Sequence, residues 1–268
     1  MKDRHRGRLT RERLHSTVLA GSRDLLVWLP PAYDAEPNRR FPVIILHDGD
    51  HVFSPLPGSG VGLGADEWVN LLSSEGVLPQ SLVVGVCHPE GFSGENASLR
   101  DFDLSPELGG VAYARFVSTE LVAYLDSHYR TLAKPEARVL GGVSLGALNT
   151  FHTALAHPGV FGHFLCLSTS FEDVSQSLPA DSGQLKALEA ETALPDGVRM
   201  YFDYGTEGLD ECYAPYHADL GSLLRGKGWR ENREFVIRRV QGGTHDQASW
   251  RSRLGDALRF AAAFISGA

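Results

Sequence analysis

The chain has 268 residues, of which 43% are hydrophobic and 22% are charged, a composition typical of a globular α/β domain with a large core. Its formal net charge of −8 argues against nucleic-acid and anionic-membrane partners, because both favour a basic surface. No stretch has the apolar length of a membrane span, and the three scattered cysteines form no paired motif, so we expect a soluble protein of the reducing cytoplasm.

Residues 1–15 are basic, and no apolar segment of signal-peptide type follows them. We therefore expect a solvated N-terminal tail over residues 1–15 and a single domain over residues 16–268. Within that domain, two extended runs at residues 17–20 and 23–29 flank Gly21 and Ser22, which predicts an antiparallel hairpin.

Further along the chain, short apolar runs alternate with amphipathic segments, which predicts a mostly parallel sheet with helices on both faces. The expected strands are residues 41–46, 81–86, 137–140, 164–167, 198–204 and 234–240. Two helices are expected to begin near residue 66 and directly after Ser144. Four others are expected at residues 111–129, 184–191, 216–225 and 250–264. This alternation predicts an α/β fold with an added N-terminal hairpin.

The sequence Gly-Val-Ser-Leu-Gly at residues 142–146 lies between an apolar run and an amphipathic helix. In that context the pattern predicts a sharp strand-to-helix turn that exposes Ser144 as a nucleophile. Gly142 and Gly146 would allow the close backbone approach that this turn requires. The alternative is a chance match in a chain with 29 glycines, but the flanking strand and helix favour the turn.

A serine nucleophile needs a base and an acid that orients the base. His245 follows the last predicted strand in a Gly-Gly loop, which is where an α/β-hydrolase arrangement places its base. For the acid we favour Asp210, with Glu207 of the same loop as the alternative. Asp203 lies inside the preceding strand and Asp246 adjoins the base, and a Ser-His pair without a fixed acid also stays open.

The backbone N–H of Leu145 and one from the loop after residues 41–46, at Asp50 or His51, are the expected oxyanion donors. His47, Asp48, Asp50 and His51 are also potential metal ligands, but such clusters in turns are more often hydrogen-bonded caps, so we expect no metal.

Arg100 and His51 are candidate substrate-binding residues. Arg100 would bind an anionic or polar acyl group, or it would simply form an ion pair with Asp101 or Asp103. Five aromatic residues are candidate pocket walls, namely Phe53, Trp68, Phe92, Tyr213 and Trp250. The glycine-rich residues 58–64 follow no strand directly, which argues against a nucleotide site.

Together these motifs resemble the putative-esterase family of α/β-hydrolases, which includes enterochelin esterases, S-formylglutathione hydrolases and feruloyl esterases. The similar stretches are residues 23–33, 41–49, 100–106, 116–130, 142–146, 157–158, 161–162 and 242–250. The resemblance implies that Ser144 is the nucleophile, that His245 is the base, and that the loop after Gly49 belongs to the oxyanion hole. Ala147 and Gln247 depart from the family pattern, where a glycine and an acid are frequent.

We therefore expect a serine esterase without a cofactor, which acts on a small-molecule ester such as a siderophore-type lactone or a small acyl ester. We expect no nucleic-acid or membrane partner, and a homo-oligomer is possible. The alternatives are an acyltransferase of the same fold and a non-catalytic, hydrolase-like binding protein.

Overall fold

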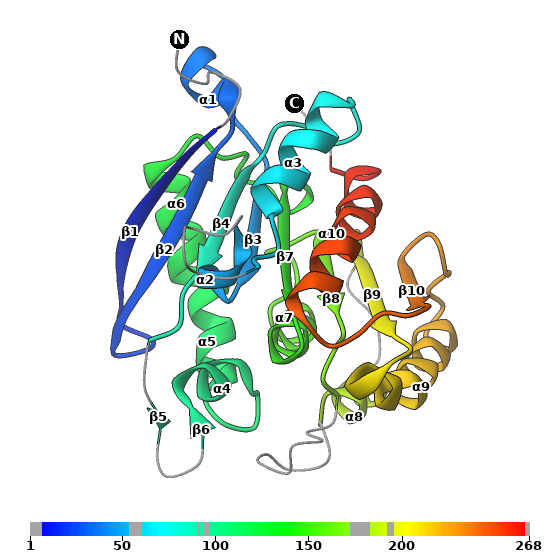
Figure 1. Ribbon diagram of the computed structural model, residues 1–268. Coiled ribbons are helices and arrows are strands. Elements are labelled where there is room, and N and C mark those ends of the chain that lie inside the picture. The colour runs from blue at the N-terminus through cyan, green and yellow to red at the C-terminus, as the bar shows by residue number, and fades with distance from the viewer. Residues whose placement is uncertain are drawn as a thin grey trace.

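A central eight-stranded sheet, with strand order β1-β2-β4-β3-β7-β8-β9-β10, organises the computed structural model of the protein (Figure 1). The structure describes residues 7–53, 61–89, 92–93, 97–171, 183–191 and 196–265. Strands β3 to β10 of this sheet run parallel to one another, whereas β1 and β2 pair antiparallel and β2 is antiparallel to β4. The bounds are β1 Arg8–Ser16, β2 Gly21–Leu29, β3 Val43–His47, β4 Leu82–Val86, β7 Arg138–Val143, β8 His163–Leu167, β9 Arg199–Gly205 and β10 Phe235–Val240. The expected fold class is confirmed.

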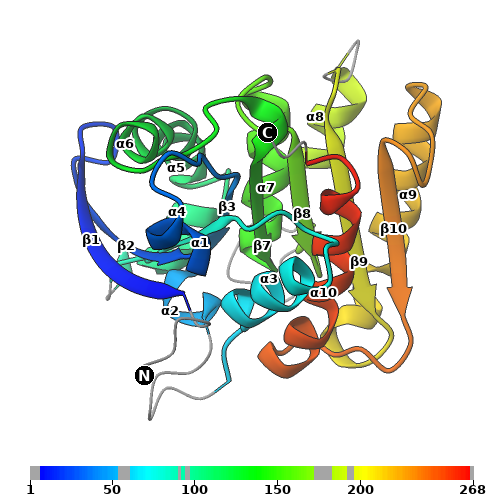
Figure 2. The ribbon, with the colours of Figure 1, turned by 90° about the horizontal axis from the view of Figure 1, so that it is seen from above.

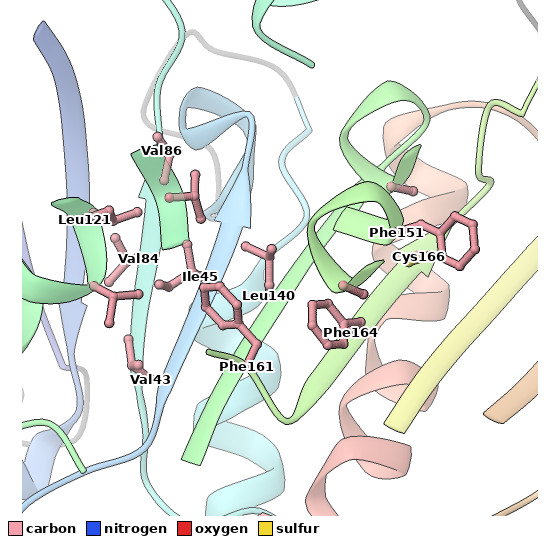
Figure 3. Packing of buried hydrophobic residues seen from close by; sticks show 14 of the residues in the cluster. Val43, Ile45, Val84, Val86, Leu121, Leu140, Phe151, Phe161, Phe164 and Cys166 are labelled. Atoms are coloured by element: carbon pink, nitrogen blue, oxygen red, sulfur yellow. The ribbon is translucent and has the colours of Figure 1, made fainter. Parts of the chain in front are cut away.

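Side chains of the central strands alternate between two buried clusters, one on each face of the sheet. In β3, Ile45 belongs to the first cluster and Ile44 to the second; in β7, Leu140 and Val139 divide in the same way. Figure 3 shows part of the first cluster, in which residues of β3, β4, β7 and β8 pack against helical side chains such as Phe151. Because both faces are covered, these strands are almost continuously apolar.

Helices cover the two faces of the sheet unequally. The second cluster contains the buried apolar side chains of α3 (Ala65–Ser74) and α10 (Gln247–Ala262), which lie side by side on one face (Figure 2). The first cluster contains buried apolar side chains of six other helical segments. These are α5 (Gly110–Phe116), the π-helical η1 (Val117–Leu121), α6 (Val122–His128), α7 (Leu145–Ala156), α8 (Gly183–Ala190) and α9 (Ala214–Gly226). No helix among the residues that the structure describes combines the length and apolarity needed to cross a membrane.

The N-terminal hairpin lies earlier in the chain than expected. Residues 17–20 form the turn, and the first strand is Arg8–Ser16, so residues 8–15 are part of the sheet and not of a tail. This strand is at the edge of the sheet, where its charged side chains face solvent and Arg11 pairs with Asp24 at 2.6 Å. A charged edge protects against pairing with other chains, but it also hides the strand pattern in the sequence.

Short elements occupy the loops near the ends of the strands. The segment after β4 contains β5 (Phe92–Ser93), β6 (Ala97–Ser98) and α4 (Leu99–Leu104), whose N-terminus is closed by a capping box between Ser98 and Asp101. The other short helices are α1 (Pro31–Ala35), α2 (Gly49–Val52), η2 (Pro135–Ala137) and η3 (Gly208–Tyr213). Residues 58–60 of the glycine-rich stretch, and residues 172–182 and 192–195, lie outside the described residues.

Candidate active site

Three residues that follow neighbouring strands have backbone conformations that residues other than glycine rarely adopt. Asp48, Ser144 and Ser168 come directly after β3, β7 and β8, and their φ angles are 58°, 57° and 47°. Positive φ at residues other than glycine is strained, and it persists only where the surroundings hold it in place. The strain therefore marks this edge of the sheet, where open α/β sheets bind their ligands.

Ser144 stands at the turn between β7 and α7, as the sequence predicts. Its φ of 57° and ψ of −122° reverse the chain in a single residue, and its side chain stays partly exposed. A Cβ atom on Gly142 would lie 2.6 Å from the carbonyl carbon of Gly146, so the turn requires glycine there. Leu145 is the first residue of α7, and its N–H therefore has no intrahelical acceptor. This N–H lies at the positive end of the helix dipole.

His245 lies between the side chains of Ser144 and Asp210. Its Nε2 is 3.0 Å from Ser144 Oγ, and its Nδ1 is 2.6 Å from Asp210 Oδ1. An ionised carboxylate only accepts hydrogen bonds, so Nδ1 carries the proton and Nε2 is left as the acceptor for the serine hydroxyl. Asp246, the next residue, caps α10 by accepting a hydrogen bond from Ser249 N. The base is thereby fixed to the start of a long helix.

Asp210 is fully buried and well supplied with hydrogen-bond donors. Besides His245, its carboxylate accepts from Ser168 Oγ at 2.6 Å and from Gly205 N at 2.7 Å. Burial alone would raise its pKa, but these hydrogen bonds outweigh burial and lower the pKa to about 2. The alternative acid, Glu207, is exposed in the same loop. The structure thus brings Asp210, and not Glu207, to His245.

Two of the five candidate wall aromatics pack against the imidazole. The ring centroids of Trp250 and Tyr213 lie 4.8 and 5.6 Å from that of His245, both edge to face. Phe53 and Trp68 instead pack in or against the second buried cluster. The side chain of Phe92 is outside the described part of the chain.

The loop after β3 separates into a buried half and an exposed half. His47 is buried with Nδ1 3.2 Å from Tyr113 Oη, and burial lowers its pKa to about 3, so it is neutral. Asp50 and His51 are exposed in α2, where the N–H of Asp50 lies in the first turn. The described residues contain no group of three or more acidic, histidine or cysteine side chains arranged to hold a metal ion.

Arg100 lies beside this loop and forms a bidentate ion pair with Asp48, with Nε–Oδ1 and Nη2–Oδ2 distances of 2.5 and 2.8 Å. Burial would raise the pKa of Asp48, but the Arg100 charge and hydrogen bonds lower it to about 2. Of the two ion-pair partners expected for Arg100, Asp101 is 3.6 Å away, and Asp103 pairs instead with Arg23 at 2.7 Å. About a third of the Arg100 side chain stays exposed.

Sequence reasoning missed two residues beside Asp210, namely Ser168 and Arg253. Ser168 carries no motif and is recognisable only by its place after a strand next to β7. Arg253 offered a signal, because it lies on the same face of α10 as Trp250, Leu254 and Ala257, which are all buried. An arginine in the apolar register of an amphipathic helix indicates a buried charge with a specific partner.

Comparisons with known proteins bear on the family and the fold of the chain. The family model described as "Putative esterase" matches residues 16–261. The uncharacterized protein YjcH of Bacillus subtilis is 31% identical over 262 residues, which cover 94% of this chain and 97% of that protein.

Solved structures similar to this chain include a ferulic acid esterase, with a TM-score of 0.75, 18% identity, and coverage of 97% of this chain and 99% of that one. The enterobactin esterase of Shigella flexneri has a TM-score of 0.72 and 19% identity. That match covers 95% of this chain but 59% of the enterobactin esterase, so the chain spans little more than half of that protein. At these identities the similarity establishes the α/β-hydrolase fold.

Proposed function

We propose that this chain, a carboxylic ester hydrolase that belongs to the Putative esterase family, works through an acyl-enzyme on Ser144. The observation that carries the proposal is the pair of contacts at His245, with Ser144 Oγ at 3.0 Å from one ring nitrogen and Asp210 Oδ1 at 2.6 Å from the other. A base held between a nucleophile and a buried carboxylate is the arrangement that serine acyl transfer requires.

In the first half of the reaction, His245 Nε2 takes the Ser144 hydroxyl proton while Oγ attacks the ester carbonyl carbon. The carbonyl oxygen becomes an oxyanion, for which Leu145 N–H and Asp50 N–H are the proposed donors. The tetrahedral intermediate then collapses: the bond from carbon to the alkoxy oxygen breaks, the imidazolium gives its proton to that oxygen, and the alcohol leaves. The acyl group remains on Ser144.

The second half repeats these steps with water. His245 takes a proton from water, the resulting hydroxide attacks the acyl carbon, and Ser144 Oγ leaves with the proton from the imidazolium. Asp210 stays ionised throughout and stabilises the imidazolium that forms in each half. No step requires a cofactor.

The proposed substrate is a small-molecule ester, with siderophore-type lactones and small acyl esters as the first classes to examine. The solved neighbours named as enterobactin and ferulic acid esterases motivate this choice. Arg100 and His51 are the proposed substrate contacts. Since Arg100 already pairs with Asp48, only the exposed part of its side chain is open to an acyl group.

The test is hydrolysis of p-nitrophenyl acetate and butyrate by the wild type and by Ser144→Ala. We expect turnover by the wild type, and a loss on the order of 10⁴-fold or more in kcat for the variant, because the nucleophile is gone. Added acceptor alcohols separate a hydrolase from an acyltransferase, since an acyltransferase yields mainly the new ester. Absence of any turnover by the wild type on acyl esters and siderophore lactones would contradict the proposal.

A further inference from the structure

Arg253 is a buried cation behind the proposed catalytic residues. It lies in α10, which packs against β8 and β9, and only 3% of its side chain is exposed. In Figure 1 this helix runs beside the strands whose ends carry Ser168 and the loop of Asp210. A charge in this position is costly unless it is paired and hydrogen-bonded, so its partners indicate why it is there.

One nitrogen of the guanidinium contacts both the acid and the backbone beside the base. Arg253 Nη2 donates to Asp210 Oδ2 at 3.2 Å and to the carbonyl oxygen of Thr244, the residue before His245, at 3.3 Å. The same nitrogen donates to Ser168 Oγ at 2.9 Å, and Ser168 in turn donates to Asp210 Oδ2 at 2.6 Å. These contacts hold Oδ2, which leaves Oδ1 directed at His245.

The other terminal nitrogen of the guanidinium binds a second buried carboxylate. Arg253 Nη1 donates to Asp203 Oδ1 at 3.1 Å, and Asp203 also accepts from Ser168 N at 3.2 Å and from Tyr201 Oη at 3.3 Å. Burial raises the pKa of Asp203 to about 6, despite the opposing charge of Arg253. The pKa of Asp210 is lowered instead, so the two carboxylates that share one cation differ in how readily they take up a proton.

We propose that Arg253 is a positioning residue, which fixes the Asp210 carboxylate and the Thr244 carbonyl relative to each other so that the Asp210–His245 hydrogen bond forms. The inference rests on the proposed function, because it assigns Arg253 a role through Asp210 and His245. It gives the residue no contact with substrate.

Attachment of α10 to the sheet does not by itself require this arginine. The buried residues Leu254, Ala257, Leu258 and Ala261 of the same helix already provide an apolar face. Replacing both partners of a buried ion pair by apolar groups is often neutral or stabilising, so a site that served stability alone could have apolar residues in place of Arg253 and Asp203 together. The geometry of the guanidinium, which reaches four acceptors, matches a positioning role instead.

The experiment compares the wild type with Arg253→Met, Arg253→Lys and the matched control Arg259→Met. Arg259 belongs to the same helix but forms a surface ion pair with Glu75. For each folded protein we would measure kcat and KM on a p-nitrophenyl ester, the rate of labelling by a fluorophosphonate, and the far-downfield proton resonance of the short Asp210–His245 hydrogen bond.

We expect Arg253→Met to lose on the order of 10²-fold in kcat, with KM little changed, because the acid is displaced without loss of substrate contacts. Fluorophosphonate labelling should slow in parallel, and the downfield resonance should shift or vanish. Arg253→Lys should recover part of the loss, and Arg259→Met should match the wild type. Should Arg253→Met fail to fold, Arg253→Lys alone decides, because a single ammonium cannot reach all four acceptors and should still lower kcat at constant KM.

The inference is overturned if a folded Arg253 variant keeps both the wild-type kcat and the downfield resonance, or if its loss appears in KM alone. The resonance is measured without substrate. If the wild type hydrolyses no ester, the proposed function is contradicted. If the resonance is nevertheless present in the wild type and lost in Arg253→Met, the positioning role is supported.

Discussion

Asp210 and Glu207 lie three residues apart in one loop, yet only Asp210 reaches His245. The chain enters η3 directly after Glu207, and this short helix turns Asp210 back under the end of β9, where Gly205 N donates to its carboxylate. Glu207 is left at the exposed start of η3. Spacing in the sequence places both acids near the base, but only the turn of η3 selects between them.

Replacement of Asp210 tests this selection at the scale of a single residue. In Asp210→Asn an amide faces His245 Nδ1, which favours the tautomer that cannot accept the serine proton. We therefore expect kcat on a p-nitrophenyl ester to fall by about 10⁴-fold. The matched variant Glu207→Gln should keep the wild-type kcat. If kcat falls as much in Glu207→Gln as in Asp210→Asn, or more, the assignment of Asp210 as the acid is contradicted in favour of Glu207.

At the scale of elements, the ends of β9 and β10 must approach closely for the acid to meet the base. A Cβ atom on Gly205, the last residue of β9, would lie 2.1 Å from Gly243 O and 2.9 Å from Asp210 Oδ2. Gly243 belongs to the loop that carries His245. The two loops therefore pack backbone to backbone, and glycine is the residue that permits this contact.

Gly205→Ala should consequently separate the two loops. We expect a loss of about 1–3 kcal/mol in the free energy of unfolding from the forced backbone shift. We also expect a fall in kcat on the order of 10²-fold from displacement of Asp210. Gly226→Ala is the control, because a Cβ atom there meets nothing within 4 Å. Chemical denaturation and steady-state kinetics measure both effects, and wild-type stability and kcat in Gly205→Ala would contradict the close approach.

The elements also show where the sequence is informative. The interior strands were recognisable because burial on both faces makes them apolar throughout, as in β3 and β8. The edge strand β1 was missed because five of its nine side chains are exposed and three of these, Arg8, Arg11 and Arg13, carry charges. The short helix α4 was missed because a capping box, and not an apolar stripe, defines its start.

At the scale of the whole molecule, the buried Asp203 couples the stability of the fold to pH. Because its pKa is raised to about 6, the folded state binds a proton that the unfolded state has released over the range from about pH 4 to 6. The contribution of this group to the free energy of unfolding therefore falls as the pH rises through that window. Above about pH 6 the Asp203 carboxyl is ionised in both the folded and the unfolded state, so its contribution to the free energy of unfolding no longer changes with pH.

Asp203→Asn should remove this dependence. We expect the unfolding free energy of the variant, relative to the wild type, to rise by about 2–3 kcal/mol between pH 4 and pH 6.5 and then to stay level. Urea unfolding at a series of pH values measures the difference. A difference that does not change with pH would show that Asp203 titrates in the folded state as it does in the unfolded chain.

The whole molecule likewise shows what sequence reasoning cannot supply. Ser144 and His245 were identifiable because each follows a strand in a glycine-flanked turn, and parallel strands end at one edge of the sheet. Arg253 and Asp210 are 43 residues apart and share no motif. Their contact depends on how α10 lies across β8 and β9, which local periodicity does not determine.

Covalent labelling is the measurement that tests the central claim most directly. A fluorophosphonate labels a serine whose proton is removed by a positioned base. Mass spectrometry of the digested protein therefore identifies the nucleophile from the mass of the labelled peptide. We predict a single adduct on Ser144, which is absent in Ser144→Ala and strongly reduced in Asp210→Asn. An adduct on another serine, or none on an enzyme that still hydrolyses esters, would contradict the account.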